Sequence, residues 1–350
     1  MRKILTIASA LVFLATPRTD IAAQTTAQTF PLTDTQGLVA KGVQMDAAEF
    51  LGRKAVRFVT QRAQGVAGFV PLPGVDFQDG TIEVDLALKL PSSGPGASGP
   101  GFIGIAFRAR PDASSYDMFY VRPGAARSTD QAARNHVAQY CAAPGSDWYA
   151  LRRGWPWVYE SYADVRLDAW THVKIEVAGR TARLYLNGNP EPTLVVDGLK
   201  GPDLRGGVSL FTFADQEGYF SNVRVTPAAA PQPVKNGSEA EGAWDVKLST
   251  DAGTFDGRMW LHRDGNKLSG TWTGALGQNR EVKGTWRDGY VELSFTGEWP
   301  DKMMDGKPGT VTATLAGWFD DASGTGRSKV DPRADGKWTA TRASADPDLP

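Results

Sequence analysis

Hydrophobic and polar residues alternate along most of the chain, which is the pattern of β-strands that bury one face and expose the other. The alternation is clearest in the stretches 81–90, 101–110, 116–122, 171–179 and 181–188. No stretch of comparable length has a helical period. Short strands separated by Gly- and Pro-rich turns predict an all-β fold in which two antiparallel sheets pack as a sandwich.

A break in this pattern divides the chain. Residues 228–241 are rich in Pro, Ala and polar residues and contain no recurring apolar positions. Such a composition is typical of an interdomain linker. We therefore predict a sandwich domain over residues 28–227 and a second domain over residues 242–345.

The second domain has short hairpin-like strands and recurring tryptophans. Asp264-Gly265 and Asp288-Gly289 are hairpin turn signals. Similar G-x-W or G-T-W surroundings recur at Trp244, Trp272, Trp286, Trp318 and Trp338. We predict seven or eight sequential antiparallel strands that close as a small up-and-down β-barrel, loosely similar to lipocalin- and avidin-type barrels. Such a barrel either holds a small ligand or is filled by its own side chains, and we favour the filled form.

The N-terminus has the pattern of a secretory signal peptide. A basic start, Met1–Lys3, precedes the apolar stretch Ile4–Ala15, and small residues follow up to Ala23. These features predict a signal peptide over residues 1–23, with Ala27 as a second candidate cleavage position, and export to the periplasm or the extracellular space. No other apolar run is long enough to predict a membrane span.

Composition excludes several classes of function. With 38 basic and 39 acidic residues, the formal net charge is −1, which argues against a nucleic-acid partner held by a basic field. Cys141 is the only cysteine, so an internal disulfide is excluded, and we expect a buried small residue rather than a nucleophile. The three histidines lack metal-ligand spacing, so we expect neither a metal site nor a required cofactor.

Seven short motifs occur in order along the first domain. They are GTIEVD (80–85), GIAFR (104–108), YVRP (120–123), DAWTHVKIEV (168–177), RLYLNG (183–188), GGVSL (206–210) and YFSNVR (219–224). Together they resemble the concanavalin A-like (laminin G-like) jelly-roll superfamily, and within it bacterial exported domains grouped with the 3-keto-disaccharide hydrolases. The resemblance covers about residues 30–227. The resemblance implies an antiparallel jelly roll. Members of this superfamily often bind a structural calcium ion, but no loop of this chain specifies one. The resemblance also implies an alternative function, a glycoside-processing hydrolase or lyase.

Laminarinase-type hydrolases of this fold carry an E-x-D-x-x-E signature on a strand. This chain has Glu83 and Asp85, but Leu88 replaces the third acid. A retaining glycosidase needs a nucleophile and a separate protonated acid, so the incomplete signature disfavours this mechanism. We expect Glu83 and Asp85 to face solvent on an outer strand.

The segment after residue 115 offers a polar and aromatic face. In YDMFYVR, alternation places four side chains on one face, namely Tyr116, Met118, Tyr120 and Arg122. The opposite face, with Asp117, Phe119 and Val121, is the core-like one. A long excursion over residues 123–166 follows, and connections of this length are usually functional.

Saccharide sites combine aromatic platforms for apolar C–H faces with side chains that hydrogen-bond hydroxyl groups. The candidate saccharide-binding residues are Arg108, Tyr120, Arg122, Gln139, Trp148, Tyr149, Arg152, Arg153, Trp155, Trp157 and Tyr159. For the enzyme alternative, the acid–base candidates are Glu160, Asp147, His136 and Tyr140, although no spacing selects a pair. Two further alternatives stay open: the rings fasten the excursion onto the sandwich, or the protein is a surface interaction module. The sequence thus predicts an exported protein that binds an oligo- or polysaccharide in a cleft of the sandwich.

Overall fold

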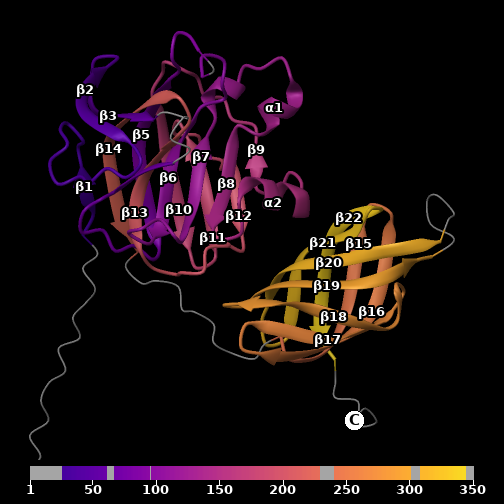
Figure 1. The fold of residues 1–350 in the computed structure, drawn as a ribbon. Coiled ribbons are helices and arrows are strands. Elements are labelled where there is room, and N and C mark those ends of the chain that lie inside the picture. The colour runs from indigo at the N-terminus through magenta and orange to yellow at the C-terminus, as the bar shows by residue number, and fades with distance from the viewer. Residues whose placement is uncertain (1–25, 61–66, 95, 229–239, 301–307, 344–350) are drawn as a thin grey trace, which may run out of the picture.

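The computed structural model describes residues 26–60, 67–94, 96–228, 240–300 and 308–343. These residues form a sandwich of two antiparallel sheets followed by a closed eight-stranded barrel (Figure 1). The predicted all-β fold, a sandwich of two antiparallel sheets followed by a small up-and-down barrel, is confirmed. The predicted signal peptide and most of the predicted linker lie outside the described residues.

The larger sheet of the sandwich has eight strands. They are β1 (Gln28–Phe30), β2 (Gln44–Phe50), β3 (Arg53–Thr60), β5 (Gly80–Lys89), β10 (Thr171–Ala178), β11 (Thr181–Leu186), β12 (Leu194–Asp197) and β14 (Gln216–Pro227). Their order is β12-β11-β10-β5-β14-β3-β2, with β1 paired to β14. The strand that carries Glu83 and Asp85 therefore lies in the middle of the sheet, not at its outer edge as predicted. Asp85 is bound locally by Arg53 at 2.6 Å and by His172 at 2.9 Å.

The second sheet of the sandwich has six strands. They are β4 (Gly68–Pro71), β6 (Phe102–Ala109), β7 (Tyr116–Val121), β8 (Ala138–Ala143), β9 (Glu160–Ser161) and β13 (Gly207–Phe213). Their order is β4-β13-β6-β7-β8-β9. One face of each sheet points inward, so that Ile82 and Val84 of the first sheet join Ile105 and Phe119 of the second in one core. The other face of the six-stranded sheet remains available for a site.

The excursion predicted over residues 123–166 is largely structured. It contains a 3₁₀ helix (Pro123–Ala125), α1 (Gln131–Asn135), β8, α2 (Trp148–Gly154) and β9. The sequence did not predict β8 because its residues are buried on both faces, so AQYCAA shows no alternation. At the start of α2 the carboxylate of Asp147 accepts a hydrogen bond from the backbone N–H of Ala150 at 2.7 Å. This N-cap stabilises the first turn of α2.

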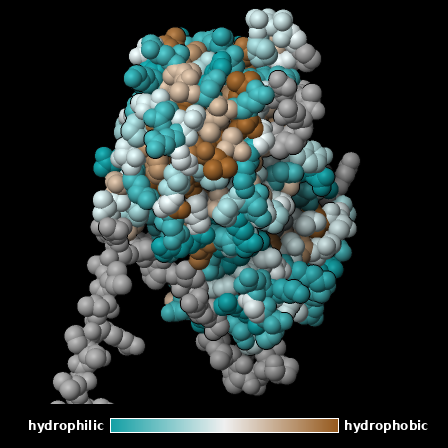
Figure 2. Space-filling view, turned by 60° about the vertical axis from the view of Figure 1, so that its left-hand side comes forward, coloured by the Kyte–Doolittle hydropathy of each residue, from teal (hydrophilic) through white to brown (hydrophobic). Residues whose placement is uncertain are grey.

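The barrel consists of eight strands in sequential order. They are β15 (Gly242–Thr250), β16 (Gly253–Asp264), β17 (Lys267–Gly274), β18 (Gly277–Arg287), β19 (Tyr290–Trp299), β20 (Gly309–Phe319), β21 (Ser323–Asp331) and β22 (Ala334–Arg342). Five tryptophans are buried inside it, namely Trp244, Trp272, Trp286, Trp299 and Trp338. The chain's own side chains thus fill the barrel, which is the alternative that the sequence favoured. Figure 2 shows hydrophobic residues gathered on the visible face of the sandwich, whereas the visible barrel surface is largely hydrophilic.

Buried ion pairs join the barrel to the sandwich. Arg180 donates from Nε to Asp288 of the barrel at 2.8 Å, and Lys200 donates from Nζ to Glu292 at 2.5 Å. In return, Arg287 donates to the backbone carbonyl of Lys200 at 2.8 Å. Burial lowers the pKa of Lys200, and the carboxylate of Glu292 opposes that shift. Both sandwich cations are buried, so separating the domains would break two ion pairs and leave Arg180 and Lys200 without these partners.

A substitution at Gly198 is expected to disturb this docking. Gly198 has φ +72°, and a Cβ there would lie 2.2–2.6 Å from ring atoms of Tyr290 in the barrel. We expect Gly198→Ala to separate the barrel from the sandwich and to enlarge the radius of gyration in small-angle X-ray scattering. Gly188 is the matched control, because it has the same φ but no atom within 4 Å of a built Cβ.

For Gly188→Ala only the backbone strain of a left-handed residue applies, about 1 kcal/mol, so the scattering curve stays unchanged. If both variants keep the dimensions of the parent protein, the contact at Tyr290 does not control docking.

Candidate functional site

A groove with a volume of about 480 Å³ lies on the outer face of the six-stranded sheet. Alternate positions of β7 supply part of its floor, namely Tyr116, Met118 and Tyr120. Phe211 and Phe213 of β13 continue the floor across the sheet. The intervening residues of both strands point into the core, so the two-residue period of the strands creates this apolar and aromatic surface.

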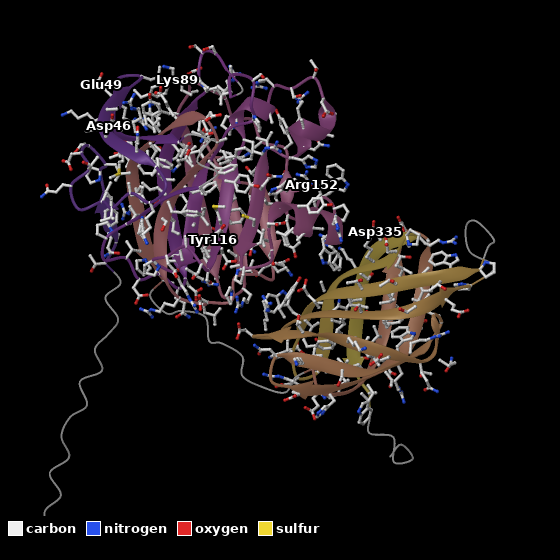
Figure 3. The ribbon with its side chains drawn as sticks, in the orientation of Figure 1. Asp46, Glu49, Lys89, Tyr116, Arg152 and Asp335 are labelled. Atoms are coloured by element: carbon white, nitrogen blue, oxygen red, sulfur yellow. The ribbon has the colours of Figure 1, made fainter. Side chains whose placement is uncertain are left out.

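One wall of the groove is built by α2. Trp148 and Arg152 are one helical turn apart and line the same groove (Figure 3 labels Arg152 and Tyr116). The guanidinium of Arg152 lies over the Trp148 ring, 4.9 Å from its centroid. Trp148 is 48% exposed, which leaves much of its ring open to a ligand. This wall therefore offers an aromatic platform and a cation together.

A buried carboxylate holds the wall in place. Glu160 of β9 accepts hydrogen bonds from Nη2 of Arg152 at 2.7 Å and from Nε2 of Gln139 at 2.9 Å. Nδ1 of His136 lies 2.8 Å from the other carboxylate oxygen. Only 8% of Glu160 is exposed, so these partners replace its hydration. The carboxylate thus fixes Arg152 and the end of α1 at the edge of the sheet.

His136 is a neutral imidazole at neutral pH. Its pKa is lowered, mainly because burial penalises the charged form; Arg152 and Arg122 add to this, and Glu160 opposes it. The ring stacks on Trp157 at 5.1 Å with an interplanar angle of 5°. A neutral ring packed in this way supports the wall but carries no charge into the groove.

The lowered pKa of His136 has a consequence for stability. The ordinary pKa of a histidine is about 6.5. As the pH falls below this value, His136 becomes protonated in the unfolded chain but stays unprotonated in the folded protein, because its folded pKa is lower. Its contribution to stability is therefore complete above about pH 6.5 and is lost progressively as the pH falls toward the lowered folded value. We expect His136→Gln to remove this part of the pH dependence, measured by urea unfolding between about pH 7.5 and 5. Parallel stability curves for the two proteins would contradict it.

Arg122 gives the groove a second guanidinium. It lies over the Phe102 ring, 5.5 Å from the centroid, and donates to the backbone carbonyl of His136 at 3.3 Å. A guanidinium has five N–H donors, and that carbonyl is the one acceptor that Arg122 meets among the described residues. The other N–H groups of Arg122 thus remain as hydrogen-bond donors for a ligand in the groove.

Six of the residues predicted from the sequence line this groove: Tyr120, Arg122, Gln139, Asp147, Trp148 and Arg152. Arg108 does not, because its guanidinium is buried in the sandwich and bound to Asp79 at 2.9 Å and to the carbonyl of Gly179 at 2.6 Å. Tyr140 is also buried away from the groove. Its hydroxyl donates to Asp117 at 2.5 Å and accepts from the backbone N–H of Lys200 at 2.6 Å. In this fold Arg108 and Tyr140 are structural groups.

The remaining members of the predicted cluster lie on other surfaces. Tyr149 is exposed on α2, and the guanidinium of Arg153 lies over its ring. Trp157 is exposed beyond His136. Trp155 and Tyr159 line a different pocket, which faces the barrel. The aromatic and basic cluster is therefore shared among a groove wall, an outer surface and a domain junction.

Sequence reasoning missed the phenylalanines of the groove. Phe102, Phe211 and Phe213 line it, and Phe102 is the cross-strand partner of Phe213. The available signal was the alternation in GVSLFTF, where Val208 and Leu210 occupy the core face. Phe211 and Phe213 lie on the opposite, outward face of the same strand, and aromatic residues on an outward face indicate a binding surface.

Cys141 is buried, as predicted, and it contributes to the floor of the groove. Burial raises the pKa of its thiol, so it stays protonated and unreactive at neutral pH. In the part of the chain that the structure describes, no three His, Cys, Asp or Glu side chains gather into a set that could hold a metal ion.

No family model matches the chain, and no curated protein matches it. Among solved structures, it is similar to the carbohydrate binding module CBM66 from Bacillus subtilis, with 17% identity, a TM-score of 0.35 and coverage of 53% of this chain and 95% of that one. A second is the exoplasmic/lumenal domain of VIP36 in a Ca2+/Man2-bound form, with 12% identity, a TM-score of 0.39 and coverage of 59% and 90%. A third is a β-glucanase from Bacillus licheniformis, with 10% identity, a TM-score of 0.36 and coverage of 58% and 98%. At these values the likeness assigns no ligand and no activity to this chain.

Proposed function

We propose that this protein binds carbohydrate in the groove on the outer face of the six-stranded sheet. The observation that carries the proposal is the combination of an open aromatic ring, Trp148, with two guanidinium groups at one groove. Aromatic faces pack against the C–H faces of sugar rings, and guanidinium groups donate hydrogen bonds to their hydroxyl groups. The volume of about 480 Å³ is within the range of small-molecule sites and leaves room for a short oligosaccharide segment.

The residues that would carry binding divide by role. Trp148 would provide the ring surface, while Arg122 and Arg152 would orient hydroxyl groups; Tyr120 and Gln139, which are almost fully buried, would support the floor. Arg122 directly follows β7 and Arg152 lies on the capped helix α2, so both guanidinium groups are positioned before a ligand arrives. Preorganised groups lose less conformational entropy on binding.

The proposal includes export to the periplasm or the extracellular space. It is supported by the basic and apolar N-terminal sequence, which lies outside the described residues. Within the described ranges, no helix combines the length and the apolar character needed to cross a bilayer.

A glycan array with the full chain, followed by isothermal titration calorimetry on the hits, tests the proposed binding. Binding to at least one glycan with no release of reducing sugar supports a recognition role. Binding accompanied by release of reducing sugar would replace it with the hydrolase alternative. If no glycan binds, the proposed function is wrong.

A further inference from the structure

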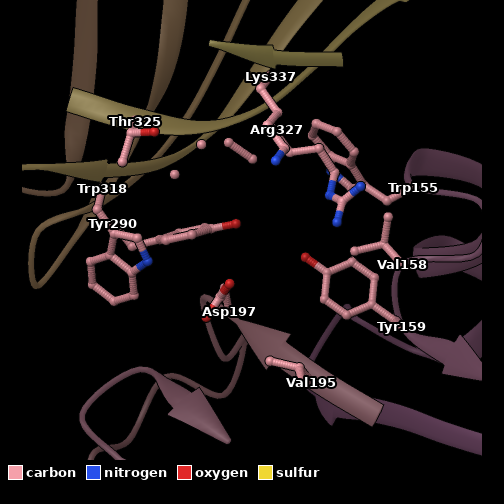
Figure 4. A pocket seen from close by; sticks show the side chains of 13 residues that line it. Trp155, Val158, Tyr159, Val195, Asp197, Tyr290, Trp318, Thr325, Arg327 and Lys337 are labelled. Carbon is pink, nitrogen blue, oxygen red and sulfur yellow. The ribbon is translucent and has the colours of Figure 1, made fainter. Parts of the chain in front are cut away.

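A second pocket, with a volume of about 290 Å³, lies between the sandwich and the barrel (Figure 4). The segment that follows α2 and strand β12 form one side, and strands β19 to β22 form the other. Its principal lining residues are Trp155, Tyr159, Tyr290, Trp318, Arg327 and Lys337. Neither domain forms this pocket alone, so its shape depends on the docking contacts described above.

Two cations lie next to each other on the barrel side. Arg327 of β21 and Lys337 of β22 are direct cross-strand partners, so both side chains are on the same face. Among the described residues neither has an ion-pair partner. Like charges directly opposite each other on a sheet are destabilising, and an anion bound between them would relieve the repulsion. Their arrangement at a pocket therefore matches an anionic ligand group.

Besides the two cations, the pocket has aromatic side chains that could pack against a sugar ring. Tyr290 and Trp318 are cross-strand partners whose rings meet edge to face at 5.0 Å. Burial raises the pKa of both Tyr159 and Tyr290, so their hydroxyl groups stay protonated. Figure 4 shows these two hydroxyl groups pointing into the pocket from opposite sides, with Asp197 near them. The pocket thus offers ring faces, hydroxyl groups and one carboxylate in addition to the cations.

We propose that this junction is a second ligand site, which binds a single acidic sugar ring. The anionic group of the sugar would lie against Arg327 and Lys337, and Asp197 would accept from its hydroxyl groups. A volume of about 290 Å³ is near the lower end of the range for ligand sites, which fits one ring rather than a chain. The site is separate from the groove, because Trp148 and Arg152 of α2 line the groove while Trp155 lines the junction.

The test uses the full chain with methyl β-D-glucuronide as the probe and methyl β-D-glucoside as its neutral counterpart, in titration calorimetry. The glucuronide is expected to bind more tightly than the glucoside. The double substitution Arg327→Ala with Lys337→Ala should weaken the glucuronide at least tenfold, since the loss of even one charge-assisted hydrogen bond costs about that much. Lys267→Ala is the matched control, since Lys267 is an exposed lysine of the barrel outside the pocket, and it should leave the affinity unchanged.

Both substituted side chains are exposed, so the double variant should keep the thermal stability of the parent protein. The inference fails if the glucuronide binds no better than the glucoside, or if the double variant binds it as well as the parent. Its failure is distinguishable from failure of the groove proposal, which concerns array glycans and Trp148. Loss of glucuronide binding in Trp148→Ala with retention in the double variant would place the acidic sugar in the groove and overturn the inference.

Discussion

Replacing Glu160 with glutamine is expected to lower the free energy of unfolding by about 2–3 kcal/mol, a value between those for breaking a buried ion pair and a surface one, because Glu160 is buried and Arg152 is partly solvated. Glutamine keeps the size of the side chain but removes the charge that Arg152, Gln139 and His136 surround. Because Arg152 is held at the groove by this carboxylate, saccharide affinity should fall with stability. Urea unfolding and titration calorimetry on the same protein measure both effects.

Asp164→Asn is the matched control for this substitution. Asp164 pairs with Arg127 at the surface, so removing its charge should change stability little. The opposite pattern, full stability and full binding of Glu160→Gln with loss of reducing-sugar release, would assign Glu160 a catalytic role instead of a positioning one.

Substitution of Trp148 with alanine is expected to have the largest effect on binding. Removing an aromatic platform at the centre of an interface typically costs about 2 kcal/mol or more, which corresponds to a loss of affinity of roughly 30-fold. Since Trp148 is half-exposed, the free energy of unfolding should change by less than about 0.5 kcal/mol. Titration calorimetry with the best array glycan measures the first effect, and urea unfolding the second.

Trp260→Ala provides the comparison, because Trp260 is exposed to a similar degree, 46% against 48%, but belongs to the barrel. This control should bind the glycan like the parent protein. An equal loss of glycan affinity in both variants would mean that exposed tryptophans contribute to binding wherever they lie, and would contradict a specific role of the groove. A loss of stability in Trp148→Ala without loss of affinity would favour the alternative in which the ring only fastens α2 to the sandwich.

Local sequence patterns predicted the all-β class and the two-domain arrangement of the fold. Alternation predicted five of the fourteen strands of the sandwich, namely β5, β6, β7, β10 and β11, and the D-G turns and recurring tryptophans predicted the barrel. Strand β8 escaped prediction because a strand buried on both faces has no alternating pattern. The position of β5 within its sheet was also missed, because the order of strands depends on pairings between residues far apart in the sequence, such as β5 with β14.

The groove could be predicted in part. The face of YDMFYVR with Tyr116, Tyr120 and Arg122 follows from the strand period alone, and it lines the groove. The burial of Arg108 could not be predicted, since its partner Asp79 is distant in sequence and reaches it only in the folded sandwich. The contact between the sandwich and the barrel could not be predicted for the same reason. Arg180 and Asp288 come from separate domains, and no local sequence pattern links them.

A crystal structure of the full chain with the best array glycan bound would test most directly whether the groove is the saccharide site. We expect a sugar ring on the outer face of the six-stranded sheet, packed against Trp148 and hydrogen-bonded to Arg122 or Arg152. A glycan bound on the outer face of the eight-stranded sheet or inside the barrel, with the groove empty, would contradict it.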